Sequence, residues 1–334
     1  MLCLSLSLIL PILVAVFLAS NNQNNRLNLM NLVFGSVETP PPDFGSGQMF
    51  DQIAGRYDMI NRVLALRMDI SWRQEMTGRI QELLRERDDN TPSSTSSWKV
   101  LDMATGTADV ALQLAQDLPP STTILGLDPS NNMLAVGRQK VSAAGLESRI
   151  TLQEADARDL SNYSSDTYDA ATMSFGIRNV PDPRQIALCE IHRLLKPGGI
   201  LGILEFSKPD DSHGILGVLA RWFIVHVVPV VGGLLSGAPR EYLHLQNSIQ
   251  DFPAPEEFRK LLQELQCPGY FDMEPVRHLN FGSVQLYIGR AVKPAAAAPV
   301  KTTNEEEKQP DDRQQDVKKD PVLPPIKSSV GDES

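Results

Sequence analysis

The chain has 334 residues, of which 42% are hydrophobic, and its formal net charge is −10. This length is enough for one core of typical size with appendages, or for two small domains. An acidic chain without a basic cluster is a poor nucleic-acid binder, because Lys and Arg supply most of that affinity. We therefore expect no nucleic-acid partner.

The cysteines and histidines indicate neither a metal site nor a disulfide framework. Cys3, Cys189 and Cys267 are far apart and odd in number. We expect Cys189 and Cys267 to be small thiols, buried or half-buried. The five histidines form no i, i+4 pair, so we expect no metal held by the protein.

The N-terminal segment is set apart by composition. Residues 1–19 are uncharged and apolar, long enough for the hydrophobic part of a signal peptide and marginal for a membrane span. No Lys or Arg precedes Arg26, so a basic start is missing, although residues 21–37 lack acids and suit a transit segment. Residues 20–47 read as a linker, and we interpret residues 1–47 as targeting or anchoring sequence.

Residues 48–88 have helical spacing. Phe50, Ile53, Ala54 and Tyr57 fall at i, i+3, i+4 and i+7, which predicts helices packed before the first strand.

The stretch from residue 99 to residue 114 predicts a strand, a small-residue turn and a helix. In open α/β sheets a ligand lies outside the carboxyl ends of the strands, against a helix N-terminus. Gly106 allows the backbone to approach such a ligand closely. Ala108 and Leu112 stand where the dinucleotide fingerprint has glycines, so the turn suits a ligand without a pyrophosphate. An ordinary strand-to-helix turn is the alternative.

The next strands each end near a carboxylate. Strand 123–127 runs into Asp128, about 20 residues past the glycine turn, where a carboxylate can accept hydrogen bonds from both ribose hydroxyls. A turn or helix-capping aspartate is the alternative. Strand 150–154 precedes Asp156 and Ala157; the acid can accept from an exocyclic amino group, and the Ala157 amide can donate to a ring nitrogen.

The remaining elements complete an alternating α/β pattern. We predict strands at 168–173 and 200–206 around a helix at 186–195 that residues 196–199 terminate, then a helix at 256–265 and a last strand at 283–288. Such buried strands predict a doubly wound sheet. The Pro-rich, charged segment from Pro294 onward should be disordered.

Residues 214–236 form the most apolar internal run. Arg221, His226 and Pro229 interrupt it, which disfavours a membrane span. The two alternatives are a buried helix pair and a lid that lines an apolar substrate channel.

Several separate blocks resemble the UbiE-like ubiquinone/menaquinone biosynthesis C-methyltransferase family of class I S-adenosylmethionine-dependent enzymes. These blocks are MFDQIAGRYDMIN, DMATGTAD, SFGIRNVPDP, LLKPGG, LEFSKP and YLHLQNSIQDFP. The resemblance implies a methyltransferase domain over residues 48–293, with a mostly parallel seven-stranded sheet, N-terminal helices and a helical lid over about 210–255. Residues 1–47 and the charged tail 294–334 lie outside it.

The resemblance also implies roles for individual residues. The methionine part of the cofactor should lie among Asp102, Gly106, Thr107 and Asp109. The ribose should meet Asp128, the adenine Asp156 and Ala157, and the cofactor site should include Ser174. The substrate ring should face Arg178 and Asn179, with Tyr57 covering the site.

Two departures from the family pattern stand out. Thr105 and Ala108 occupy positions where many members have glycine. The segment ALRMDISWRQ differs from the commoner Gly-Ile-His-Arg-x-Trp-Lys pattern, which leaves the quinone branch open.

The implied activity is C-methylation of a polyprenylated benzoquinol in ubiquinone biosynthesis, with S-adenosylmethionine as the methyl donor. A demethylmenaquinol or demethylphylloquinol methyltransferase is the alternative, as is a non-catalytic scaffold in a quinone-synthesis complex. Methyl transfer requires the quinol to lose a hydroxyl proton. Arg178 could stabilise the resulting phenolate, or it could instead belong to a structural ion pair. Since arginine is a poor proton acceptor, the base would be a water that it orients or a group such as His226.

The same interpretation predicts partners and a location. The partners are the polyprenyl quinol, other quinone-biosynthesis enzymes, a membrane surface bound peripherally and a second copy in a homodimer. The predicted location is the matrix side of the mitochondrial inner membrane, with a plastid as the alternative.

Overall fold

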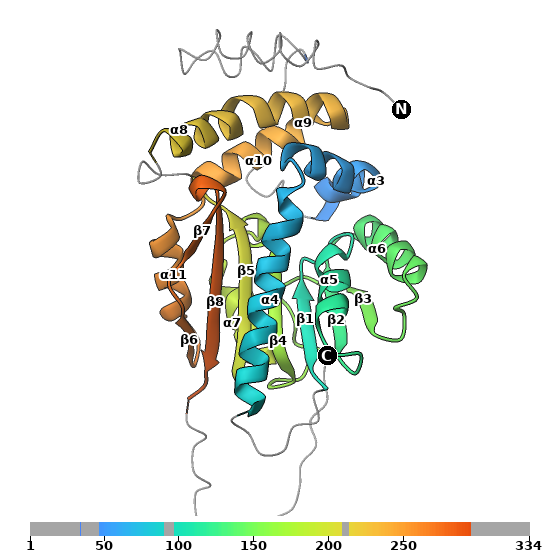
Figure 1. Cartoon of the computed structure of the whole chain (residues 1–334), viewed down its shortest axis with the longest axis vertical. Coiled ribbons are helices and arrows are strands. Elements are labelled where there is room, and N and C mark those ends of the chain that lie inside the picture. The colour runs from blue at the N-terminus through green and yellow to red at the C-terminus, as the bar shows by residue number, and fades with distance from the viewer. Residues whose placement is uncertain (1–33, 35–46, 90–96, 209–213, 295–334) are drawn as a thin grey trace, which may run out of the picture. The chain divides into compact units, whose positions relative to one another are not determined.

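The computed structural model describes residue 34 and residues 47–89, 97–208 and 214–294 (Figure 1). The predictions of a targeting segment, a linker and a disordered charged tail therefore lie almost wholly outside the described residues.

The predicted N-terminal helices are confirmed as α3 (Gly47–Leu64) and α4 (Met68–Asp89). On α4, Trp72, Met76 and Ile80 recur every fourth residue and are buried against the sheet. Arg67, between the two helices, has a φ of +64°, a left-handed conformation that favours glycine. The chain thus departs from the family's glycine pattern at a position where the backbone still takes a glycine-like conformation.

A mostly parallel, twisted sheet forms the centre of the molecule (Figure 1). Its hydrogen-bonded order is β3-β2-β1-β4-β5-β8-β6, and β7 pairs with β8 beside this path. Strands β1 to β5 pair with one another in parallel, whereas β8 is antiparallel to β5, β6 and β7. The strands are β1 (Lys99–Met103), β2 (Thr123–Asp128), β3 (Ile150–Glu154), β4 (Tyr168–Ser174), β5 (Leu195–Phe206), β6 (Tyr270–Met273), β7 (Arg277–Leu279) and β8 (Val284–Val292).

The doubly wound sheet is confirmed, with three differences in detail. The described residues form eight strands, because the three-residue β7 adds to the seven-strand path. Neither β6 nor β7 was predicted, since each is too short to show a clear alternation. Residues 196–199 lie within β5 as a bulge, because Tyr168 pairs with Leu195 and Ala170 with Ile200.

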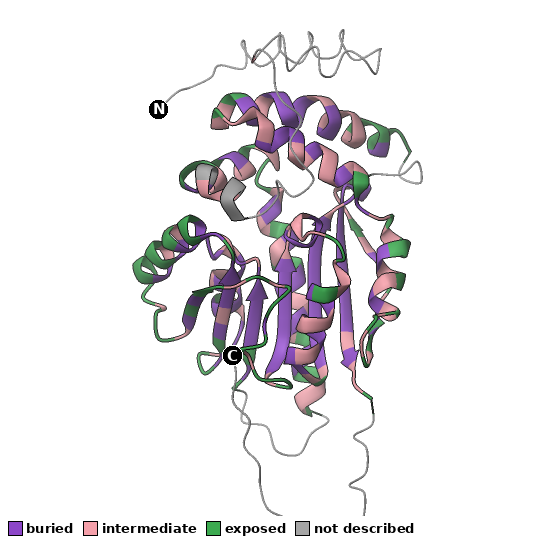
Figure 2. Cartoon of the chain, turned by 180° about the vertical axis from the view of Figure 1, so that it is seen from behind, coloured by how far each residue is buried: buried purple, intermediate pink, exposed green. Residues whose placement is uncertain are grey.

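Helices cover both faces of the sheet, and successive strand residues bury alternately on each side. Val100 packs in the cluster under α4, α5 (Asp109–Asp117) and α6 (Asn131–Ala143), whereas Leu101 packs in the cluster under α7 (Gln185–Leu194) and α11 (Pro255–Gln263). The central strands are mostly buried (Figure 2). The continuous apolar runs in the sequence arise from this two-sided burial.

A group of helices lies across the carboxyl ends of the parallel strands (Figure 1). Here α8 (Gly214–Trp222), a π-helical turn η3 (Phe223–Val227) and α9 (Val228–Ser236) follow one another, and α10 (Pro239–Asp251) packs against α9. Of the described residues, only the helix Gly214–Ser236 is long and apolar enough to cross a membrane by length and composition. It also contacts α3 and α10, and 39% of its most apolar window is buried.

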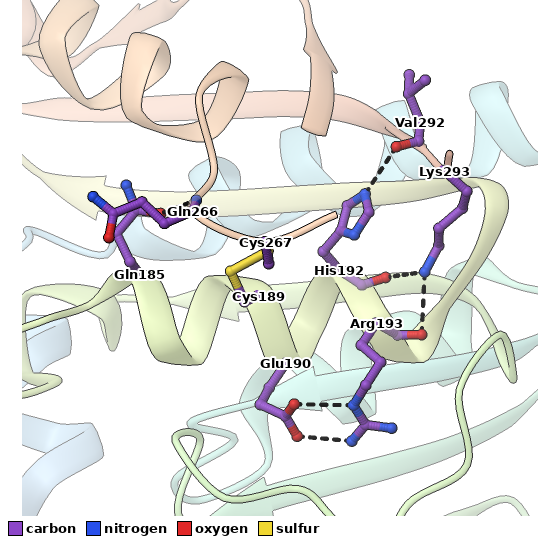
Figure 3. The surroundings of a disulfide bond; sticks show 9 residues. All are labelled: Gln185, Cys189, Glu190, His192, Arg193, Gln266, Cys267, Val292 and Lys293. Atoms are coloured by element: carbon purple, nitrogen blue, oxygen red, sulfur yellow. Dashed lines mark hydrogen bonds and ion pairs between the residues drawn. A yellow bond between two sulfur atoms is a disulfide. The ribbon is translucent and has the colours of Figure 1, made fainter. Parts of the chain in front are cut away.

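The prediction of two free thiols is wrong: Cys189 and Cys267 form a disulfide (Figure 3). The bond joins α7 to the segment after α11, and their Cα atoms are 5.9 Å apart. Beside it, the Gln266 amide donates to Gln185 Oε1 over 3.1 Å. Sequence reasoning missed the pair because 78 positions separate the two cysteines, and only folding brings them together.

Substituting one cysteine should measure what the disulfide contributes to stability. We expect Cys189→Ser to lower the free energy of unfolding by about 2–4 kcal/mol, because the unfolded chain loses a long covalent loop. Denaturant titration of the non-reduced full chain gives this value. Cys267→Ser, the double variant and the reduced wild type should show the same loss, and equal stability of oxidised and reduced wild type would contradict the assignment.

Candidate active site

A cavity of about 650 Å³ lies above the carboxyl ends of the central strands. The strand order reverses between β1 and β4, which is where open α/β sheets bind ligands. Its walls come from α3, α4, the loop after β1, the segment after β4 and the helices from α8 to α10. Of the predicted site residues, the cavity is lined by Tyr57, Gly106, Thr107, Asp109, Ser174, Arg178 and Asn179.

The loop after β1 is held open by backbone conformation and hydrogen bonds. Gly106 has a φ of +54°, and an added Cβ would lie 3.3 Å from Met133 Cε. Ala108 has a φ of +65°, which is why glycine would suit this position, and alanine is the smallest residue that carries a side chain. The loop therefore keeps the shape that glycines favour at a position where the sequence lacks one.

Asp128 lies at the end of β2 with its carboxylate beneath the loop. Its Oδ2 accepts from the Gly106 amide over 2.8 Å, and its Oδ1 accepts from the Ser130 amide over 2.9 Å. Burial raises the pKa of Asp128 to about 6, although the two amides favour the ionised form. The carboxylate thus adjoins the glycine turn, as a ribose-binding group must, but it does not line the cavity itself.

Asp102 lies below the same loop and is 1% exposed. It accepts hydrogen bonds from the Thr105 hydroxyl over 2.6 Å and from the Thr172 hydroxyl over 2.7 Å. Burial raises its pKa to about 6. In this arrangement Asp102 supports the loop from beneath, and a direct contact with the cofactor stays a prediction.

Asp109 is the centre of an ion-pair cluster that ties the N-terminal helices to α5. It accepts from Lys140, from Arg62 Nη2 over 2.8 Å, and from Arg73 Nη2 over 3.2 Å. Burial opposes ionisation, but these cations hold the pKa of Asp109 below its ordinary value. The Thr107 hydroxyl donates to Asp58 over 2.6 Å, which extends the cluster to α3.

The predicted adenine-binding residues lie away from the cavity. Asp156 is half exposed and pairs with Arg158 over 2.7 Å, which holds the pKa of Asp156 below its usual range. Ala157 packs at the edge of the second core cluster. Neither lines the cavity, so their contact with adenine stays a prediction.

Three buried polar atoms at the inner end of the cavity have no hydrogen-bond partner among the residues that the structure describes. They are Ser174 Oγ, Arg178 Nε and Asn179 Oδ1. Buried polar atoms are rarely left unpaired, because desolvation without a partner costs about 1–3 kcal/mol for each group. All three residues line the same cavity, which indicates that a polar ligand completes their hydrogen bonds.

Arg178 is held rigidly by a buried partner. Its Nη1 donates to Glu205 Oε1 over 2.6 Å and to the Phe175 carbonyl over 2.8 Å. Glu205 is fully buried at the end of β5 and also accepts from the Arg178 backbone amide over 3.2 Å. Phe175 has a φ of +56°, an uncommon conformation that places its carbonyl within reach of both Arg178 and Asn179. The structural ion pair of Arg178 is thus present, and it leaves Nε in the cavity wall.

Aromatic side chains surround this arginine. The rings of Phe175 and Phe206 lie 4.5 Å apart, and Trp72 meets both of them edge-on. The Arg178 guanidinium lies 5.5 Å from the centre of the Phe206 ring. Tyr57 faces the same region, and burial raises its pKa while the charge of Arg178 partly offsets this.

The outer wall of the cavity is apolar and comes from the predicted lid. Residues of α8, η3 and α9 line it, namely Leu216, Leu219, Ala220, Trp222, Phe223, Ile224 and Val228. This supports a lid that lines a channel rather than a helix pair buried throughout. His226 does not line the cavity; its ring lies 5.7 Å from that of Trp222. The histidine that does line it is His244 on α10.

Sequence reasoning missed Glu205, His244 and the cations around Asp109. Glu205 left a signal, because an acid inside the apolar run 200–206 must find a buried cation. His244 left no such signal, since a histidine on an amphipathic helix lies as often on the solvent-exposed face as on the buried one. The partners of Asp109 come from three different helices, so no local pattern announces them.

The model of the ubiE/COQ5 methyltransferase family matches residues 43–289. The chain belongs to this family. A ubiquinone/menaquinone biosynthesis C-methyltransferase from Geobacter sulfurreducens is 39% identical over 72% of this chain and 86% of its own length. A demethylmenaquinone methyltransferase from Thermus thermophilus is 36% identical over 72% of this chain and 99% of its own length. A solved S-adenosylmethionine-dependent methyltransferase from Aquifex aeolicus covers 62% of this chain and 87% of its own, at 16% identity and a TM-score of 0.40.

The protein is therefore an S-adenosylmethionine-dependent C-methyltransferase with the Rossmann-like class I fold. The site fits this cofactor, because Gly106 takes a conformation open to a close ligand and the unpaired Ser174 hydroxyl faces the cavity from the end of β4. The cofactor supplies a methyl group on a sulfonium, which is already a good leaving group. The protein must align this group with the acceptor.

Cofactor binding should weaken in acid if the Asp128 carboxylate accepts from the ribose. Since burial raises the pKa of Asp128 to about 6, the carboxylate is ionised at pH 7.5 and mostly protonated at pH 5. We expect affinity for S-adenosylmethionine to fall about tenfold between these values, as measured by calorimetry on the full chain.

Asp128→Asn is the matched variant for this measurement. It should bind more weakly at pH 7.5 and show no further fall in acid. If the variant keeps the same pH dependence, a different group is responsible, and Asp102, whose pKa is also raised to about 6, is the first to examine.

Proposed function

We propose that the chain methylates a ring carbon of a polyprenylated benzoquinol in ubiquinone biosynthesis. The observation that carries this proposal is the pairing of one buried cation with an apolar cavity. Arg178 Nε lies unpartnered among the described residues at the inner end, and the lid supplies apolar side chains at the outer end. A quinol with a polyprenyl tail has the complementary shape, with one polar ring and a long hydrocarbon chain.

The acceptor must be the reduced quinol, because the ring carbon of an oxidised quinone is itself electrophilic. Loss of a hydroxyl proton moves electron density onto the ring carbon, which then attacks the methyl group. Arg178 stabilises the phenolate oxygen by charge and by its free N–H. Glu205 fixes the guanidinium in place, so little reorganisation accompanies the reaction.

The aromatic cluster of Trp72, Phe175 and Phe206 would position the ring beside Arg178. All three line the cavity, and their ring faces and edges offer a flat acceptor several stacking geometries. Asn179 Oδ1 can accept from a quinol hydroxyl, and Tyr57 can donate to a ring oxygen.

A demethylated naphthoquinol is the second candidate acceptor. It is favoured by two relatives, from Thermus thermophilus and Deinococcus radiodurans, that are named demethylmenaquinone methyltransferases and are 36% and 38% identical to this chain. The same arginine, aromatic cluster and apolar lid would serve this ring.

A side-by-side transfer assay distinguishes the two acceptors. The full chain in detergent, under reducing conditions, receives methyl-labelled S-adenosylmethionine with a methoxy-benzoquinol or with a demethyl-naphthoquinol. We expect label in the benzoquinol. Label in the naphthoquinol alone would assign the second candidate, and label in neither, with the cofactor bound, would rule out both quinols.

A variant with Arg178 and Glu205 both replaced provides the inactive control for this assay. Replacing Arg178 alone leaves a buried carboxylate unpaired, which is strongly destabilising. The double variant Arg178→Gln, Glu205→Gln removes both charges together and keeps a polar side chain at each position. We expect its kcat to fall about 10²–10³-fold, the usual effect of losing an oxyanion donor, while affinity for the cofactor is unchanged.

We also propose that the rim of this cavity contacts the lipid bilayer in which such a substrate is dissolved. Leu66 and Ile215 are 72% and 79% exposed, and Leu216, Leu219 and Phe281 are about half exposed. Leu66, Leu216, Leu219 and Phe281 also line the cavity, so the exposed apolar surface continues into it. A tail could pass from lipid to Arg178 without crossing water.

Vesicle flotation tests this surface. The variant Ile215→Gln, Val218→Gln changes two exposed residues of α8 that do not line the cavity. We expect about tenfold weaker binding to phosphatidylcholine–phosphatidylglycerol vesicles, because less apolar area leaves water. Turnover of a short-chain quinol in detergent should be unchanged. Ile186→Gln changes an exposed residue of α7 outside the cavity and is the control. Equal loss of vesicle binding in both variants would contradict the proposed membrane contact.

The remaining expectations stay predictions. They are a mitochondrial inner-membrane location with a plastid as the alternative, association with other quinone-biosynthesis enzymes, and a homodimer.

A further inference from the structure

His244 lies in the wall of the cavity, on α10, which packs against the segment that carries Arg178. It is half-buried, and the Arg178 guanidinium is near enough to act on it electrostatically. His244 therefore shares one chamber with the cation that would hold a quinol oxygen. Titratable and charged groups also face this chamber from every side. These are Tyr57, Asp58 and Arg62 from α3, Asp69 and Arg73 from α4, Asp109 from α5, Arg178 from η1 (Ile177–Asn179), and Glu241 and Tyr242 from α10.

Most of these groups cannot take a proton from a quinol at neutral pH. Arg178 is already protonated, and burial raises the pKa of both Tyr57 and Tyr242, so each keeps its own proton. Burial, and then the charge of Arg178, hold the pKa of His244 below its ordinary value. Its imidazole is therefore neutral at pH 7, and a neutral imidazole carries one unprotonated ring nitrogen that can act as a base.

The carboxylates of the cavity are placed differently. Asp58, Asp69 and Asp109 are engaged by Lys140, Arg62 and Arg73 at the cofactor end. Glu205 is bound to Arg178 and does not line the cavity. Glu241 does line it, one helical turn before His244, and is the competing group that an experiment must separate.

We propose, resting on the quinol methylation above, that His244 is the general base that removes the hydroxyl proton of the acceptor while Arg178 holds the resulting phenolate. Position and charge both support this assignment over His226. His226 lies against Trp222 and does not line the cavity, whereas His244 and Arg178 line the same cavity.

The protons and bonds balance with no further reactant. His244 takes the hydroxyl proton, and the ring carbon forms a bond to the methyl group as the methyl–sulfur bond breaks and leaves its electron pair on sulfur. The resulting dienone loses the hydrogen from the methylated carbon, and its oxygen regains a proton from the imidazolium. One proton is released overall for each methyl group transferred.

The test compares His244→Asn with His226→Asn and Glu241→Gln in the full-length protein. At saturating S-adenosylmethionine, which removes the effect of Asp128, we expect His244→Asn to lower kcat about 10²–10⁴-fold, as loss of a general base usually does. Affinity for the cofactor should be unchanged. His226→Asn should retain wild-type turnover.

The pH profile separates a base from a structural residue. Because the neutral imidazole is the active form and its pKa is lowered, wild-type kcat/KM for the quinol should fall in acid, at a pH below the ordinary imidazole pKa of about 6.5. In His244→Asn this limb should vanish, and activity should rise towards alkaline pH as the quinol ionises in solution. A fluorinated, more acidic quinol should restore part of the lost rate in this variant alone.

Each other outcome has a definite meaning. Unchanged kcat in His244→Asn, or an acidic limb that His244→Asn keeps and Glu241→Gln loses, overturns the assignment while quinol methylation stands. If His244→Asn loses the same fraction of its turnover with the ordinary and the fluorinated quinol, the assignment is also overturned. A purely structural role of His244 predicts no selective recovery with the more acidic quinol. Absence of methylation by the wild type overturns both proposals together.

Discussion

The buried ion pair between Arg178 and Glu205 is the contact on which the active site depends. The two groups meet over 2.6 Å between η1 and the end of β5, where the arginine side chain is 6% exposed and the glutamate is fully buried. A pair buried in this way contributes little net stability, because desolvation opposes the attraction, but losing either partner leaves an uncompensated charge. Its value is in geometry: the pair fixes the position of the guanidinium at the wall of the cavity.

The rest of the site is arranged around this fixed cation. Phe175 takes an uncommon backbone conformation that lets its carbonyl receive both Arg178 and Asn179, and local strain of this kind gathers where function requires it. The glycine turn after β1 and Asp128 after β2 lie across the switch point of the sheet from Arg178, so in the proposed reaction the two reactants approach from neighbouring strand ends. The sheet supplies the rigid base, and the helices above it complete the walls.

Two different environments meet in one cavity. Towards the cofactor, the cations around Asp109 tie α3 and α4 to α5, so the covering helices are held by charge. Towards the lid, apolar residues of α8 and α9 continue to an exposed rim. A cavity that is ionic at one end and apolar at the other fits the proposed reaction, in which a polar cofactor and a lipid-like acceptor bind side by side in a fixed arrangement. Alignment of donor and acceptor is the main requirement for this methyl transfer, because the sulfonium donor is already activated.

The sequence by itself determined the fold class, the order of the main strands along the chain, and the places of the glycine turn, Arg178 and Asn179 after β1 and β4. These follow from local signals, because buried strands, a glycine turn and signature blocks are all readable within a few consecutive residues. Only the tertiary structure decided that Arg178 pairs with Glu205, that His244 rather than His226 faces the chamber, and that Cys189 bonds to Cys267. Each of these depends on which side of an element a residue occupies and on what folds against it, and neither is encoded in the neighbouring sequence.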